Sequence, residues 1–165
     1  PEERIILAGH SVGGVVARLA LVRRQIPHAT ALITIASPHL GTPRAEQALD
    51  ATDGSFPFGI IRDFFGGSGY YTAKYSRGLY WDIIQPYPGS FLHWLNFQSH
   101  PDIQYYSIVR SGPFVLSGDF LVPGFSQDMN RVPPLAGKST LYTIGSDHFL
   151  TPGDGHLLVK ILKDL

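Results

Sequence analysis

An α/β fold, with a mostly parallel sheet and flanking helices, is the architecture that this 165-residue sequence predicts. Short apolar runs rich in β-branched residues alternate with segments of helical apolar spacing. The first strand, helix and strand follow one another at the distance of a right-handed parallel crossover. We expect a single domain over residues 1–165, with strands over residues 4–8, 31–36, 105–109 and 141–144.

Helices are predicted between and after these strands. The first begins at Val12 and ends near Gln25, because the proline at position 27 cannot continue a helix. A short helix is expected over residues 90–96, and a terminal helix over 156–164 has regularly spaced apolar residues. Residues 54–89 are rich in Gly, Pro and aromatic residues without a sustained period. We interpret them as an insertion that lines an apolar pocket over the site, an irregular loop region being the alternative.

The composition argues against several classes of partner. The formal net charge is zero, so there is no basic surface for nucleic acid, and no apolar run has the length of a membrane span. The absence of cysteine excludes disulfides and thiol chemistry, but it leaves the cellular compartment open. The sequence therefore predicts no particular localisation.

A strand, a sharp turn and a helix meet near the start of the chain. The turn and its flanks consist of Gly9, His10, Ser11, Val12, Gly13 and Gly14. A serine on such a turn has strained backbone angles, and we expect the glycines two residues to either side to prevent collisions of Cβ atoms. The turn would expose Ser11 Oγ and place the Val12 N–H at a helix N-terminus, where it can hold an oxyanion. These residues predict a nucleophile elbow, the alternative being a glycine-rich turn with a solvated serine.

A nucleophilic serine needs a base within reach and an acid that orients the base. In doubly wound sheets functional residues gather at the carboxyl ends of the parallel strands, which directs attention to the loops after Val109 and Ile144. The first acid after Val109 is Asp119, and the loop after Ile144 contains His148. The chain order Ser, Asp, His is the order that such folds use.

Other residues compete for both roles. His156 is the main rival base, but we expect it to begin the terminal helix, whereas His148 lies in the loop before that helix. His39 follows the second strand, where a loop-fixing role is preferred, and His10 is expected to point away from the site. The alternatives to Asp119 as the acid are Asp102 and Asp128.

A metal-dependent site is a weaker alternative. A small group of acidic and histidine residues near the C-terminus consists of Asp147, His148, Asp154 and His156. Their spacing matches no standard zinc signature. We therefore expect no metal and no other cofactor.

Several segments resemble one known superfamily. Residues 9–18 resemble the elbow of α/β-hydrolase lipases and of the related GPI inositol-deacylases. Residues 37–42 are similar to the segment after the next strand in that group, and residues 89–96 to the stretch before its acid-bearing strand. The resemblance runs nearly end to end, with residues 54–89 excluded.

The resemblance implies an ester hydrolase in which Ser11, Asp119 and His148 are nucleophile, acid and base and the Val12 N–H lies in the oxyanion hole. The substrate would be a lipid-like ester, as for a lipase or a GPI inositol-deacylase, and the latter would favour the secretory pathway or a membrane. A non-catalytic fragment or binding module is the alternative class.

Strands that precede the elbow are also part of that superfamily's fold, and one of them leads to a second oxyanion donor. We expect residues 1–165 to hold the C-terminal part of such a fold, without the N-terminal strands, and the missing half to be a possible partner.

Overall fold

The computed structural model describes residues 3–24, 26–52, 76–112 and 118–165. Four strands in these residues form one sheet in the order β1-β2-β3-β4, and every neighbouring pair is parallel. The strands are β1 (Ile5–His10), β2 (Ala29–Ile35), β3 (Gln104–Arg110) and β4 (Ser139–Ile144). The α/β class and the parallel sheet predicted from the sequence are confirmed, with β1 and β4 at the two edges of the described sheet.

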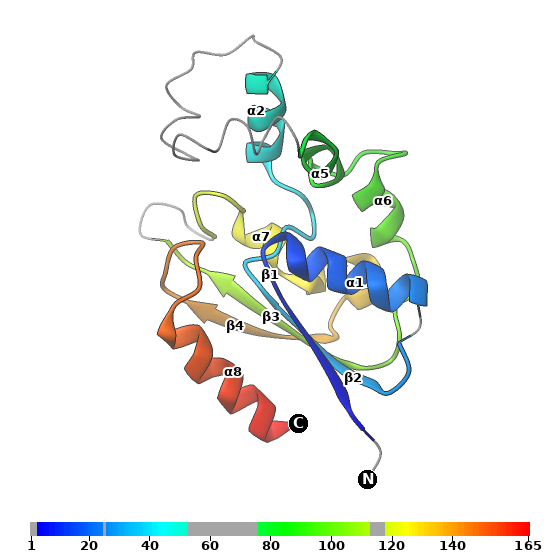
Figure 1. Cartoon of the computed structure of the whole chain (residues 1–165), viewed down its shortest axis with the longest axis vertical. Helices are drawn as coiled ribbons and strands as arrows, with labels where there is room; N and C mark the ends of the chain where they lie inside the picture. Colours follow the sequence, from blue (N-terminus) through cyan, green and yellow to red (C-terminus); the bar gives the residue numbers. More distant parts are fainter. Residues whose placement is uncertain (1–2, 25, 53–75, 113–117) are drawn as a thin grey trace.

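Helices and short 3-10 turns surround this sheet (Figure 1). They are α1 (Val12–Arg24), α2 (Pro43–Thr52), α5 (Arg77–Asp82), α6 (Phe91–Asn96), α7 (Gly124–Gln127), α8 (Pro152–Asp164), η1 (Met129–Arg131) and η2 (Pro133–Leu135). Among the described residues, no helix combines the length and the apolar character that crossing a membrane requires.

The core occupies both faces of the sheet, as the alternating directions of strand side chains require. On one face Ile33 and Ile35 of β2 belong to a buried cluster with Ile161 of α8. On the other face Leu32 belongs to a cluster with Leu21 of α1. Because β2 is buried on both sides, its sequence is an almost continuous apolar run, which is typical of a parallel sheet.

Helix α8 begins at Pro152, four residues before the predicted start, so the expectation that His156 begins this helix is wrong. The Asp154 carboxylate accepts a hydrogen bond from the backbone N–H of Thr151 at 2.7 Å. A capping contact of this kind and a proline in the first turn are standard signals of a helix start. The residues that supply them, Thr151, Asp154 and Pro152, are present in the sequence. His156 consequently lies inside the helix, with an exposed side chain.

The proposed insertion over residues 54–89 is described only in part, because residues 53–75 lie outside the described residues. The remainder contains helix α5, which the sequence analysis did not predict. Helix α2, which buries Ala45, Ala48 and Leu49 at helical spacing, and the four-residue helix α7 were also not predicted.

Candidate active site

Ser11 is the single residue between β1 and α1. Its φ of 53° lies in the left-handed region, which is strained for any residue that carries a Cβ. The turn is held by the Ser11 N–H, which donates to the Ile35 carbonyl at 2.8 Å, and by the Gly14 N–H, which donates to the Ser11 carbonyl at 3.1 Å. This is the strand-turn-helix geometry that the sequence predicts.

The glycines around Ser11 differ in whether the structure leaves room for a Cβ atom at their positions. A Cβ added at Gly9 would lie 2.5 Å from the Gly14 nitrogen, and one added at Gly14 would lie 2.2 Å from Ser37 Oγ. A Cβ added at Gly13 would meet no atom within 4 Å. The expectation that Gly13 prevents a collision is therefore wrong, and the close packing after the serine is at Gly14.

We expect Gly13→Ala to raise the free energy of unfolding by about 0.5–1 kcal/mol, because alanine loses less backbone entropy in a helix. Gly14→Ala is expected to lower it by about 1–3 kcal/mol, because Ser37 has to move. Chemical unfolding of both variants beside the wild type measures the difference. A destabilised Gly13→Ala or a neutral Gly14→Ala would contradict this packing.

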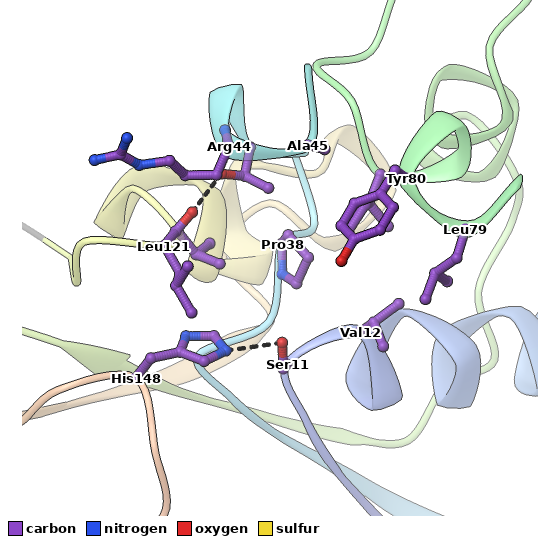
Figure 2. A pocket seen from close by; sticks show the side chains of 12 residues that line it. Ser11, Val12, Pro38, Arg44, Ala45, Leu79, Tyr80, Leu121 and His148 are labelled. Carbon is purple, nitrogen blue, oxygen red and sulfur yellow. Dashed lines mark hydrogen bonds between the residues drawn. The ribbon is translucent and has the colours of Figure 1, made fainter. Parts of the chain in front are cut away.

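The structure brings Ser11, Asp119 and His148 together. His148 Nε2 lies 2.9 Å from Ser11 Oγ (Figure 2), and on the other side of the ring His148 Nδ1 lies 3.0 Å from Asp119 Oδ2. Asp119 and His148 are each 5% exposed. A neutral imidazole that donates from Nδ1 to the carboxylate leaves Nε2 free to accept the serine proton. The three side chains come from the turn or loop that follows β1, β3 and β4 respectively.

Asp119 accepts four hydrogen bonds. Oδ1 accepts from the backbone N–H groups of Leu121 and Val122, both at 2.8 Å, and Oδ2 accepts from Gln127 Nε2 and His148 Nδ1, both at 3.0 Å. Burial alone would raise the pKa of Asp119, but the bonds from His148, Val122 and Leu121 lower the pKa overall. The carboxylate therefore stays ionised at neutral pH beside the imidazole.

The loop that carries Asp119 depends on close backbone packing. Gly118 has a φ of 105°, and a Cβ there would lie 2.2 Å from the Gly124 nitrogen. Gln127 links this loop to the sheet, since its Oε1 accepts from the Arg110 N–H at 2.8 Å while its Nε2 donates to Asp119. The role of Gln127 was not predicted, because nothing in the local sequence separates it from an ordinary surface glutamine.

The other acidic residues considered for the site do not contact His148 in the hydrogen bonds described. Asp128 accepts from the Asn130 N–H at 2.9 Å and caps η1, and Asp102 precedes β3, at the end of the sheet away from Ser11. Asp154 is paired with Arg110 at 2.6 Å. The described residues contain no group of three or more His, Cys, Asp or Glu side chains that could hold a metal ion.

His10 has a different position from the expected one. Its Nε2 lies 2.7 Å from the backbone carbonyl oxygen of His148, and the two imidazole rings are 5.0 Å apart between centroids. The expectation that His10 points away from the site is wrong. The contact joins residues that are 138 positions apart, so no local pattern predicts it.

A pocket of about 190 Å³ opens beside Ser11 (Figure 2). Its walls come from the elbow, the segment after β2, helices α2 and α5, and the loops that carry Asp119 and His148. The lining residues are Ser11, Val12, Pro38, Thr42, Arg44, Ala45, Leu79, Tyr80, Ile83, Leu121, Val122 and His148. Most of these side chains are apolar. The described part of the predicted insertion contributes Leu79, Tyr80 and Ile83.

A buried polar network supports the pocket wall. The Arg18 guanidinium donates to His100 Nε2 at 3.2 Å, to His39 Nδ1 at 3.1 Å and to Asn96 Oδ1 at 2.6 Å. Asn96 Nδ2 in turn donates to the His39 carbonyl at 3.0 Å. His39 thus anchors the loop that contains Pro38, in agreement with the loop-fixing role expected for it.

Both imidazoles in this network must be neutral to accept from Arg18. Burial, followed by the Arg18 charge, holds the pKa of His39 well below its usual value and lowers the pKa of His100 to about 4. Burial also lowers the pKa of Arg18 to about 9, which leaves the guanidinium charged at neutral pH. Protonation of either histidine would place a second cation beside Arg18.

Acid is therefore expected to destabilise the fold before the carboxylates titrate. Between the unfolded pKa of about 6.5 and the folded pKa of about 4 for His100, the unfolded chain binds more protons. Stability is thus full above that window and lost as the pH falls through it, by on the order of 2 kcal/mol for a half-buried imidazole. Urea unfolding between pH 8 and pH 4 measures the loss. His100→Gln keeps an acceptor for Arg18 without titrating, so an unchanged slope in this variant would contradict the assignment.

The chain is similar to one protein family over part of its length and to one solved structure over most of it. Residues 1–52 match the model of the PGAP1-like alpha/beta domain. A solved structure of a lipase-esterase related protein from Clostridium acetobutylicum ATCC 824 superposes with a TM-score of 0.55 at 13% sequence identity. The match covers 98% of this chain and 65% of that chain, so this chain spans about two thirds of the length of that protein. No curated protein sequence matches the chain.

The structural match confirms the α/β-hydrolase fold that the sequence resemblance predicts, and residues 1–52 carry the similarity to the PGAP1-like domain. The family match covers the elbow, α1, β2 and the segment through α2. The fold match extends over nearly the whole chain.

Proposed function

We propose that this protein hydrolyses carboxylic esters through an acyl-serine intermediate on Ser11. The observation that carries the proposal is the continuous chain of hydrogen bonds from Ser11 Oγ to His148 and on to Asp119, with contacts of 2.9 and 3.0 Å. Ser11 stands on a strained turn, and Ser11 and His148 line a mostly apolar pocket. A serine with a hydrogen-bonded base and an ionised orienting acid is the arrangement of an activated nucleophile.

Acylation of the serine is the first half of the proposed reaction. Ser11 Oγ attacks the ester carbonyl carbon while His148 Nε2 takes its proton. The negative charge that develops on the carbonyl oxygen is held by the Val12 N–H, which belongs to the first turn of α1 and has no acceptor within the helix. The carbon–oxygen bond to the alcohol then breaks, and His148 returns the proton to the leaving alcohol.

Hydrolysis of the acyl-enzyme completes the cycle. A water molecule gives a proton to His148 and attacks the acyl carbon. Collapse of the second tetrahedral intermediate breaks the bond to Ser11 Oγ, which regains a proton from His148 as the carboxylic acid leaves. Asp119 remains ionised throughout and stabilises the imidazolium that forms twice in each cycle.

The pocket supports a lipid-like ester as substrate. Its apolar side chains from α2, α5 and the Asp119 loop favour a hydrocarbon group, because moving such a group out of water lowers the free energy of the system. The match of residues 1–52 to the PGAP1-like domain favours a second candidate within the same chemistry, the removal of an acyl chain from an inositol of a glycolipid anchor. Acid release from an inositol-acylated glycolipid, compared with release from a triacylglycerol, distinguishes the two.

Covalent labelling tests the nucleophile directly. A fluorophosphonate probe is expected to add one phosphonyl group to the wild-type protein, with the modified peptide containing Ser11. Ser11→Ala is expected to lose the label completely, since the probe requires an activated serine. Labelling that persists in Ser11→Ala would mean that another residue is the nucleophile. A folded wild type that the probe does not modify would favour the binding-module alternative.

A further inference from the structure

The base and the nucleophile are carried by the two edges of the described sheet. Ser11 follows β1, whereas His148 lies in the loop that follows β4. With β2 and β3 between them, the two edge strands are about 14 Å apart at the usual strand spacing. The loop over residues 145–151 therefore has to reach across the ends of the sheet to bring His148 to Ser11.

Packing alone does little to hold this loop. The two residues after the base, Phe149 and Leu150, are 67% and 58% exposed. The backbone is anchored instead by hydrogen bonds, in which Arg110 donates to the Phe149 carbonyl at 3.1 Å and the Thr151 N–H donates to Asp154 at 2.7 Å. The first bond connects the loop to β3 and the second connects it to α8.

His10 supplies the connection to the elbow. A carbonyl oxygen only accepts hydrogen bonds, so the 2.7 Å contact requires a proton on His10 Nε2, which it donates to the His148 carbonyl. Among the hydrogen bonds described for this loop, this one and the Ser11–His148 contact are the two that reach β1 or the turn after it. The adjacent residues His10 and Ser11 thus contact the backbone and the side chain of the same histidine.

We propose that His10 is a positioning residue of the active site, whose Nε2–H holds the base loop against the elbow and keeps His148 in reach of Ser11. The inference rests on the proposed hydrolase function. The imidazole of His148 is fixed by Asp119 at Nδ1, while its backbone is fixed by His10, so that Nε2 has one position relative to Ser11 Oγ. A displacement of about 1 Å of a catalytic group can cost about a hundredfold in rate.

Two substitutions of His10 distinguish the effect of its hydrogen bond from the effect of its aromatic ring. His10→Phe keeps an aromatic ring beside His148 but removes the donor, whereas His10→Gln keeps an N–H donor of similar reach. We expect His10→Phe to lower kcat for ester hydrolysis, and the rate of fluorophosphonate labelling, by about 10- to 100-fold with KM within about twofold. His10→Gln is expected to recover kcat to within about threefold of the wild type. The exposed His156, replaced by Phe, is the matched control and should change neither rate.

The hydrogen bond from His10 to the His148 carbonyl can also be tested in the wild-type protein, without measuring turnover. In the wild-type protein labelled with ¹⁵N in histidine, the ring spectrum at pH 8 is expected to show His10 with its proton on Nε2. A proton on Nδ1 would overturn the inference, as would a folded His10→Phe with wild-type kcat or a folded His10→Gln as slow as His10→Phe. A wild type without labelling or turnover would count against the hydrolase proposal, and the ring spectrum would still decide whether His10 holds the loop.

Discussion

Replacing His148 by alanine is expected to lower kcat for ester hydrolysis by about a thousandfold or more. The variant removes the acceptor 2.9 Å from Ser11 Oγ, so the hydroxyl attacks without losing its proton to a neighbouring base. The Val12 N–H and the apolar pocket remain, and KM is therefore expected to change by less than about tenfold. Steady-state hydrolysis of p-nitrophenyl esters gives both parameters.

His156→Ala is the control for this result. That side chain is exposed on α8 and was the strongest rival for the base on sequence grounds. Its removal is expected to leave kcat within about twofold of the wild type. Equal losses in the two variants, or a larger loss in His156→Ala, would overturn the assignment of His148 as the base.

The parts of the fold that depend on neighbouring residues were predictable. Parallel strands, crossover helix and elbow follow from an apolar run, a glycine-rich turn and a helical apolar spacing, which lie next to one another in the sequence. The order of Ser11, Asp119 and His148 restricted the candidates further, because functional residues gather at the carboxyl ends of parallel strands. The structure brings these three side chains together, and their catalytic roles are the hypothesis that the variants test.

What could not be predicted depends on tertiary contacts. The role of Gly14 depends on Ser37, which reaches it from the segment after β2, whereas Gly13 faces open space despite occupying the motif position. The contact of His10 with the base loop likewise exists only because the loop crosses the sheet. A histidine beside a nucleophile has the same local sequence whether it points toward the base or away from it.

Asp119→Asn is expected to lower kcat by about ten-thousandfold at neutral pH, as loss of the orienting acid does in serine hydrolases with the same arrangement. The backbone N–H groups of Leu121 and Val122 lie 2.8 Å from Oδ1 and cannot reverse their direction, so the single oxygen of asparagine has to face them. The amide NH₂ then replaces Oδ2 and faces His148 Nδ1.

That exchange changes the tautomer of the base. His148 would accept at Nδ1 from the asparagine amide and carry its own proton on Nε2, and in this form it cannot take the proton of Ser11. Asp128→Asn is the matched control, because Asp128 caps η1 without contacting His148, and its kcat is expected to stay within about twofold of the wild type. The two variants are compared by kcat and by unfolding, so that loss of fold is distinguished from loss of the base. A folded Asp119→Asn that retains a tenth of the wild-type kcat would show that His148 does not depend on this carboxylate for its orientation.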